Sequence, residues 1–301
     1  MTMLTRREWH KLMAAGLLAG AAGRAPRARG RQAEAGGESR IRGVLIGVQS
    51  YSFRDRDLEG LIDGMRAVGV TSCELWQGHV EPRELGGRDA REEMRRWRLT
   101  APLDHFRSIR ERFEAAGLTL NSYNISFQDH FSDDEIDRGF EMAKALGVPS
   151  ITASAHVNSV PRIARMAGAH GMPVAMHNHS RVDANEFSSP AQFAAAVAQG
   201  DGRTIAVNLD IGHFVAANHD PVAWLRDHHE QVTTLHLKDR RRGDGPNVPW
   251  GEGDAPIAAV LHMVRDEGWD IPCNIEYEYR GGDTVEEVRR CFEYCRDALE
   301  A

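Results

Sequence analysis

Short β-branched or apolar runs alternate with amphipathic stretches along most of the chain. The alternation begins near Ile41 and repeats eight times. A buried strand followed by a helix with one apolar face produces this pattern, which is typical of parallel βα units. We predict strands at residues 44–51, 71–76, 118–124, 149–155, 173–178, 204–210, 232–237 and 271–277. Predicted helices between them include residues 58–68, 133–146, 160–170 and 285–299.

Four of the helical segments end on a glycine that leads directly into the next strand. These glycines are Gly69, Gly117, Gly147 and Gly171. Glycine adopts the left-handed conformation that ends a helix without steric cost, so each one marks a helix C-terminus. Eight units in about 260 residues match the size of a TIM barrel. The predicted fold is therefore α/β, a (β/α)8 TIM barrel.

A doubly wound open sheet is the alternative fold for the same alternation. Dinucleotide-binding sheets of that kind carry a GxGxxG motif after the first strand. Here the first predicted strand continues into Phe53 and Arg54 without such a motif. The sequence therefore favours the closed barrel.

Residues 1–40 differ in composition from residues 41–301, which we predict to form the barrel domain. Arg6 and Arg7 lie in a segment that resembles the twin-arginine export motif, and the apolar stretch 12–23 follows it. We predict a signal peptide and linker here, and a periplasmic or otherwise exported protein. The apolar stretch is too short to span a bilayer, so no stable membrane anchor is expected. A basic helix that stays attached is the alternative, and residues 19–22 and 33–35 both offer small residues for cleavage.

Composition narrows the class of function. The chain has 301 residues, of which 42% are hydrophobic and 27% charged, as expected for a globular protein. Its net charge of −7 leaves no basic stripe for a phosphate backbone, so we expect no nucleic-acid partner. The cysteines show no CxxC spacing and are predicted to be buried thiols, although an oxidising compartment would permit a disulfide. They are Cys73, Cys273, Cys291 and Cys295.

Metal-ligating side chains close four consecutive predicted strands. His177, Asp210, His236 and Glu276 end the fifth to the eighth strand. One such residue has ordinary structural explanations, but four on neighbouring strands are hard to explain by packing, because the strand ends of a barrel face one pocket. Imidazole and carboxylate ligands suit one divalent metal ion such as Mn²⁺, Co²⁺, Zn²⁺ or Fe²⁺. His179 and Glu278 share a strand face with two of these residues and are the alternative ligands.

These motifs resemble the sugar phosphate isomerase/epimerase group of the xylose isomerase-like TIM-barrel superfamily. The resemblance covers residues 44–299 and is strongest in 209–213, 236–239 and 275–278, with softer support in 49–54 and 73–76. It implies one metal ion held by His177, Asp210, His236 and Glu276. It also implies a small-molecule carbohydrate substrate.

The chain departs from the commonest pattern of that group, in which a glutamate stands where this chain has His177. In the epimerases of the group, two carboxylates face opposite sides of a substrate carbon. With His177 on strand five, Glu276 remains as a base beside a metal-polarised carbonyl. A second acid or base must then come from another side chain, and the candidates are His213, His179, His156, Lys238 and Glu278.

Further substrate contacts are predicted around the same pocket. Tyr51, Glu74, Asn124 and His156 close the first four strands, and His179, Glu278 and Trp250 complete the predicted set. Trp76, Phe127 and Trp250 offer flat surfaces for a sugar ring, with ordinary core packing as the alternative. The two longest connections, 77–101 and 238–256, are expected to cover the pocket. In the second of these, residues 240–242 are three arginines that form either a solvated charge run or an anion or sugar contact.

Four functions are compatible with these residues. The first is a metal-dependent isomerase or epimerase that removes a proton α to a carbonyl of a sugar. The second is a metal-dependent lyase or dehydratase that expels a β-leaving group from a keto-sugar or 3-keto-glycoside, which His177 and an export signal favour. An AP endonuclease is disfavoured because its trinuclear site needs an Asp-x-His motif that residues 240–253 lack. A non-catalytic sugar-binding protein is the fourth. The sequence does not determine the oligomeric state, for which a dimer and a tetramer are among the options.

Overall fold

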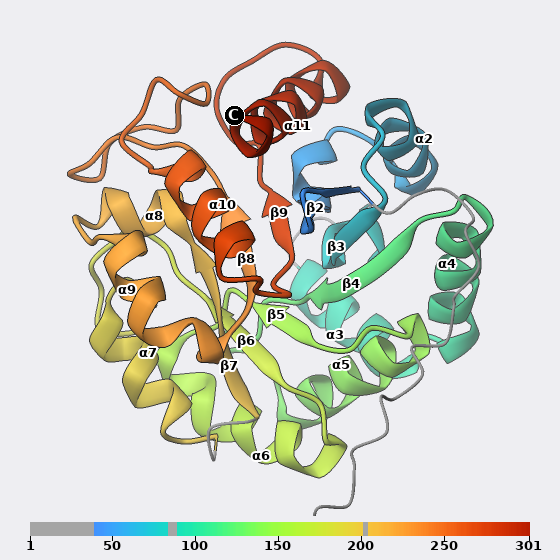
Figure 1. Cartoon of the computed structure of the whole chain (residues 1–301). Helices are drawn as coiled ribbons and strands as arrows, with labels where there is room; N and C mark the ends of the chain where they lie inside the picture. Colours follow the sequence, from blue (N-terminus) through green and yellow to red (C-terminus); the bar gives the residue numbers. More distant parts are fainter. Residues whose placement is uncertain (1–38, 84–88, 201–203) are drawn as a thin grey trace, which may run out of the picture. The chain divides into compact units, whose positions relative to one another are not determined.

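Eight parallel strands form a closed barrel in the computed structural model, which describes residues 39–83, 89–200 and 204–301 (Figure 1). The strands pair in chain order, and the first and last barrel strands also pair with each other. They are β2 (Val44–Gln49), β3 (Ser72–Trp76), β4 (Thr119–Asn124), β5 (Ile151–Ala153), β6 (Val174–His177), β7 (Ile205–Asp210), β8 (Val232–Leu237) and β9 (Cys273–Ile275). The closure confirms the predicted TIM barrel and excludes the open sheet. The predicted export segment lies outside the described residues.

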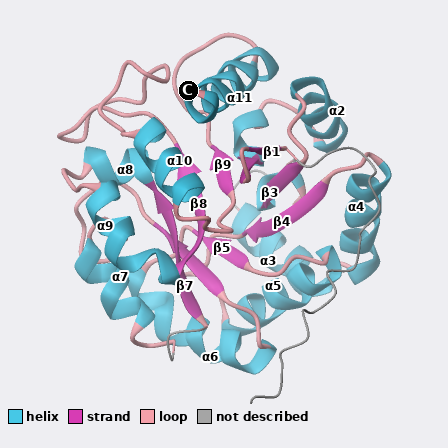
Figure 2. Ribbon diagram, viewed as in Figure 1, coloured by secondary structure: helices cyan, strands magenta, loops and turns pink. Residues whose placement is uncertain are grey.

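Helices surround the strands, as Figure 2 shows. They are α2 (Leu58–Val68), α3 (Ala90–Thr100), α4 (Leu103–Ala115), α5 (Asp133–Leu146), α6 (Val160–His170), α7 (Pro190–Val197), α8 (Ile211–Ala216), α9 (Pro221–His228), α10 (Ile257–Asp266) and α11 (Thr284–Glu300). Short 3₁₀ turns follow several strands, at η1 (Ser50–Phe53), η2 (Gln77–His79), η3 (Val157–Ser159) and η4 (His229–Gln231). A two-residue strand, β1 (Arg40–Ile41), pairs antiparallel with β2. Among the described residues, no helix is both long and apolar enough to cross a membrane.

Local signals explain where the helices begin and end. Ser132 and Glu135 form a capping box at the start of α5, and each side chain bonds the other's backbone N–H. The four predicted C-terminal glycines, Gly69, Gly117, Gly147 and Gly171, all have φ between +62° and +89°. This left-handed backbone confirms that they end helices and set the start of the following strands.

Several predicted segments differ in extent from the structure. The predicted eighth strand, 271–277, shortens to Cys273–Ile275, and the last two residues of the predicted first strand, 44–51, belong to η1. The predicted connection 77–101 contains η2 and α3, because the charged run before Trp97 forms an amphipathic helix. The predicted fourth strand, 149–155, shortens to Ile151–Ala153 because its last residues lead towards η3. All four cysteines are buried free thiols, as predicted.

Polar side chains fill the barrel interior beneath the strand ends. Asn274 donates to Glu74 Oε2 at 3.0 Å and to Thr234 Oγ1 at 2.8 Å, and its own oxygen accepts from Asn121 Nδ2 at 2.9 Å. Gly47 makes room for this network, since a Cβ there would lie 2.2 Å from Asn274 Oδ1. The network positions Glu74 under the candidate site.

Candidate metal centre

Four buried side chains converge at the carboxyl ends of β6, β7, β8 and β9. One ligand atom from each of His177, Asp210, His236 and Glu276 lies within 4.8 Å of the others. Strand register produces this convergence, because Asp210 of β7 pairs directly with His236 of β8. These are the four residues that the sequence predicts as metal ligands.

His177 is suited to act as a neutral nitrogen ligand. Its side chain is 4% exposed, and its Nδ1 is buried without a hydrogen-bond partner among the described residues. Burial, and then the charge of His236, hold the pKa of His177 well below its usual value. A buried imidazole nitrogen is costly to leave unpaired, so a bound cation would satisfy it.

His236 lies between two carboxylates. Its Nδ1 is 3.1 Å from Glu276 Oε2, and its Nε2 is 2.8 Å from Glu74 Oε2. Burial lowers the pKa of His236, but Glu74 and Glu276 outweigh this and raise it to about 10. In metal sites, a ligating histidine usually donates its second N–H to a carboxylate, which orients the ring. Glu74 is placed for that role, behind the imidazole rather than in the pocket.

Lys238 holds the carboxylates of the site together. Its Nζ lies 3.0 Å from Asp210 Oδ2, 2.8 Å from Glu276 Oε2 and 2.7 Å from Glu278 Oε2. Burial alone lowers the pKa of Lys238, but these carboxylates raise it above its usual value. For Glu276, burial raises the pKa, but Lys238 and His236 hold it well below its usual range, so this carboxylate is ionised.

Asp210 experiences opposing influences. Burial raises its pKa to about 7, although Lys238 acts in the other direction. Its Oδ1 caps α8 by accepting the backbone N–H of His213 at 2.6 Å. The remaining oxygen, Oδ2, faces Lys238 Nζ.

The donor set fits a divalent metal. Two imidazoles and two carboxylates, all buried, match the ligand chemistry of Zn²⁺, Mn²⁺, Co²⁺ or Fe²⁺. The unpaired His177 nitrogen and the Glu74–His236 contact support this assignment. A metal ion would compete with the Lys238 ammonium for Asp210 and Glu276.

A pocket of about 240 Å³ opens above these residues. Its lining includes the predicted contacts Tyr51, Asn124, His179, His213 and Glu278, together with Trp76. The sequence reasoning missed three polar lining residues, Gln49, Ser126 and Ser154. Gln49 lay in a recognised motif, whereas the two serines carry no distinguishing pattern.

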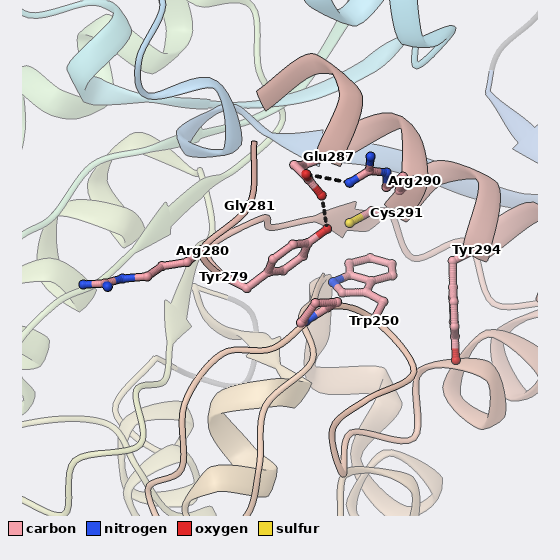
Figure 3. Close-up of a pocket in the computed structure, with 9 residues that line it drawn as sticks. Trp250, Tyr279, Arg280, Gly281, Glu287, Arg290, Cys291 and Tyr294 are labelled. Atoms are coloured by element: carbon pink, nitrogen blue, oxygen red, sulfur yellow. Dashed lines mark hydrogen bonds and ion pairs between the residues drawn. The ribbon is translucent and has the colours of Figure 1, made fainter. Parts of the chain in front are cut away.

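Three predicted substrate contacts do not line the pocket. Glu74 is one of them, because it is fully buried behind His236. His156 does not line the pocket, because its Nδ1 pairs with Asp129 Oδ2 at 3.1 Å on the loop after β4. Trp250 lines a different cavity, of about 280 Å³, beside α11 (Figure 3). There its ring meets Tyr294 edge-on, with centroids 5.8 Å apart.

The loop that carries Trp250 is held away from the pocket by Asp239. Its carboxylate accepts the backbone N–H groups of Gly251, Gly253 and Ala255 at 2.8 to 3.1 Å. Phe127 is fully buried and stacks on Phe140 in the core, so the packing interpretation holds for it.

The three successive arginines separate into two kinds. Arg240 is 9% exposed and makes specific contacts, whereas Arg241 and Arg242 are exposed. The solvated-run interpretation therefore applies to two of the three. Arg240 contacts His213 of the pocket, at 2.6 Å from its Nδ1.

Solved structures share this fold at low sequence identity. The 3-keto-D-glucoside 4-epimerase YcjR of E. coli has 13% identity and a TM-score of 0.64, over 84% of this chain and 99% of that one. The protein IolI, with a bound zinc atom, has 13% identity and a TM-score of 0.65, over 85% and 98%. The "probable 3-DHS dehydratase AsbF" of Bacillus anthracis has 14% identity and a TM-score of 0.63, over 83% and 98%.

Sequence comparison identifies the family. A search of curated proteins finds no match to this chain. The sequence profile described as "Xylose isomerase-like TIM barrel" matches residues 62–297, which is most of the chain. The protein therefore belongs to the xylose isomerase-like TIM barrel family.

Proposed function

We propose that this protein is a metal-dependent isomerase or epimerase that removes a proton α to the carbonyl of a sugar or sugar derivative. One observation carries the proposal. The ligand atoms of His177, Asp210, His236 and Glu276 lie within 4.8 Å of one another at the floor of a polar pocket. Membership of a family whose structural neighbours include epimerases, isomerases and dehydratases supports it.

The bound metal would supply Lewis-acid polarisation of a substrate carbonyl, which makes the adjacent carbon acidic. Glu276 is the proposed base, since its ionised carboxylate lines the pocket and is held by Lys238 and His236. His213 faces the same pocket and is the proposed partner for a substrate oxygen. Lys238 keeps Glu276 and Glu278 in fixed positions, 2.8 and 2.7 Å from its ammonium.

The pocket lining favours an uncharged substrate. No lysine or arginine is among its described lining residues, whereas Glu276 and Glu278 are. Away from the metal, a phosphate or carboxylate group would therefore meet repulsion from these carboxylates with no lysine or arginine of the described lining to pair with. Amide, hydroxyl and imidazole groups remain to bind sugar hydroxyls, and Trp76 and Tyr51 offer aromatic surfaces. The volume of about 240 Å³ is small, which favours a single sugar ring.

A lyase that eliminates a β-leaving group from a keto-sugar or 3-keto-glycoside is the second candidate. His177 favours it, because β6, the fifth strand of the barrel, contributes an imidazole where epimerases of this group have a carboxylate. Without two opposed carboxylates, return of the proton to the other face of the carbon lacks its usual acid. Both candidates share the first step, removal of the α-proton by Glu276.

Metal-loaded protein incubated in deuterium oxide with uncharged keto-sugars separates the candidates. An isomerase or epimerase incorporates solvent deuterium at the α-carbon and yields a rearranged sugar. A lyase releases the aglycone of a 3-keto-glucoside without an epimerised sugar. Absence of both deuterium incorporation and release across the substrate set, with metal bound, would contradict enzymatic function and favour a sugar-binding protein.

We also propose that the protein is exported through the twin-arginine pathway. Arg6 and Arg7 before a short apolar stretch support the proposal. Replacement of both by lysine should retain the protein in the cytoplasm of its host, as fractionation would measure. Unchanged export of the double variant would contradict it.

A further inference from the structure

Ser126 lies just beyond the end of β4 and lines the pocket above the candidate metal centre. The residue is half-buried, and its hydroxyl group has no hydrogen-bond partner among the described residues. Its two chain neighbours, Ile125 and Phe127, are fully buried in the core. A serine hydroxyl at the wall of a polar pocket can donate to, and accept from, a bound hydroxyl group. Ser126 is therefore suited to bind a hydroxyl of a sugar.

The backbone of Ser126 is bonded to a side chain from a different connection. Its N–H donates to Gln77 Oε1 at 2.6 Å. Gln77 begins η2, directly after Trp76, which lines the same pocket. A backbone N–H only donates, so the carbonyl oxygen of the Gln77 amide, and not its NH₂ group, must face Ser126. The contact thus joins the connection after β3 to the connection after β4.

The other end of the Gln77 amide is fixed by a buried ion pair. Its Nε2 donates to Glu81 Oε2 at 3.1 Å. The same carboxylate accepts from Arg98 of α3, whose Nε and Nη2 lie 2.7 and 3.0 Å from its two oxygens. Both charged side chains are buried. A carboxylate paired with a guanidinium only accepts, so it selects the same amide orientation that the Ser126 N–H requires.

We propose that Ser126 binds a substrate hydroxyl group and that Gln77 is the positioning residue that holds Ser126 at the pocket wall. The first part rests on the proposed function, because it needs a sugar in the pocket. The second part is a property of the folded chain. Glu81 and Arg98 fix the Gln77 side chain before any ligand binds. The Ser126 segment is therefore ordered in advance, which lowers the entropic cost of binding.

Amide hydrogen exchange followed by NMR tests the positioning role without a substrate. Gln77→Met removes the acceptor and keeps an unbranched side chain, and Gln199→Met is the matched control at an exposed glutamine. We expect the Ser126 N–H to exchange at least about fivefold faster in Gln77→Met, because one hydrogen bond is lost, and at the wild-type rate in Gln199→Met. An unchanged rate in folded Gln77→Met would refute the role of Gln77 and leave Ile125 and Phe127 as the support of Ser126. The wild type alone gives a first check, since a Ser126 N–H that exchanges like an unprotected amide would refute the contact.

Steady-state kinetics of the metal-loaded protein tests the substrate contact, with a keto-sugar that the deuterium oxide experiment shows to be turned over. Ser126→Ala removes the hydroxyl and keeps the backbone N–H. We expect KM to rise about five- to tenfold in Ser126→Ala and Gln77→Met while kcat stays within about twofold, because the lost hydrogen bond serves ground state and transition state alike. Gln199→Met should match the wild type. An unchanged KM in Ser126→Ala would refute the contact. Turnover of no sugar would instead defeat the proposed function, and hydrogen exchange would still decide the role of Gln77.

Discussion

Glu74 offers a sharp perturbation of the metal centre, because it is fully buried and touches no pocket surface. Its Oε2 lies 2.8 Å from His236 Nε2, and its Oε1 accepts from Thr152 Oγ1 at 2.7 Å. Glu74→Gln preserves the shape. The new amide NH₂ can face Thr152, whose hydroxyl also accepts, so the carbonyl oxygen stays against His236. The substitution thus removes charge while it keeps the hydrogen bond.

The expected loss of metal affinity is the one seen when a residue that hydrogen-bonds a metal ligand from outside is changed. Mutation of such a partner typically weakens metal affinity about 10- to 100-fold, or roughly 1.4 to 2.7 kcal/mol. Competition with a chromophoric chelator for Zn²⁺ or Co²⁺ would measure it. Glu81→Gln is the matched control, since Glu81 is also buried after β3 but pairs with Arg98, at 2.7 Å. We expect Glu81→Gln to retain wild-type affinity. Equal affinities for wild type and Glu74→Gln, or equal losses in both variants, would refute the orienting role of Glu74.

Three further predictions concern the buried charge of Lys238, the loop 238–256 and the pH dependence of stability. Lys238→Met should lower the stability of the metal-free protein by about 3–5 kcal/mol in urea unfolding, since it leaves buried carboxylates unpaired. The same variant should bind metal more tightly, because it removes a cation that competes for these carboxylates. Asp239→Ala should release the loop 238–256 and speed its cleavage in limited proteolysis, because three backbone N–H groups lose their acceptor. Burial, and then Arg83, lower the pKa of His79 to about 4. Between about pH 6.5 and 4 the unfolded chain therefore binds a proton on His79 that the folded protein does not bind. The free energy of unfolding should fall by about 3 kcal/mol as the pH drops from 6.5 to 4, and by less in His79→Gln.

Each of these has a contradicting result. Unchanged metal-free stability in Lys238→Met would show that the ammonium does not balance the carboxylates. Cleavage of Asp239→Ala at the wild-type rate would show that other contacts hold the loop. Equal pH dependence of unfolding in wild type and His79→Gln, at the same metal content, would remove His79 as a source of acid sensitivity.

The barrel and its strand ends were predictable because they depend on local signals. The spacing of apolar residues distinguishes strands from helices, and glycines such as Gly69 and Gly147 mark where the helices end. A closed barrel then brings the ends of β6 to β9 together whatever the loops do. The residues that end them, such as Asp210 and His236, therefore converge as expected.

Orientation beyond the strand ends was not predictable, because it depends on partners distant in the sequence. His156 turns away from the pocket towards Asp129, and Trp250 follows a loop folded by Asp239. Glu74 reaches His236 through the barrel interior, across 162 positions of sequence, so its supporting role is visible only in three dimensions.

Metal content is the most direct test of the central claim that strands β6 to β9 hold one divalent ion. Elemental analysis of dialysed protein should find about one equivalent of a divalent transition metal per chain in the wild type and in His156→Ala, whose imidazole pairs with Asp129 outside the pocket. The folded His236→Ala variant should retain almost none. A wild type without stoichiometric metal after loading, or full retention by His236→Ala, would contradict the account.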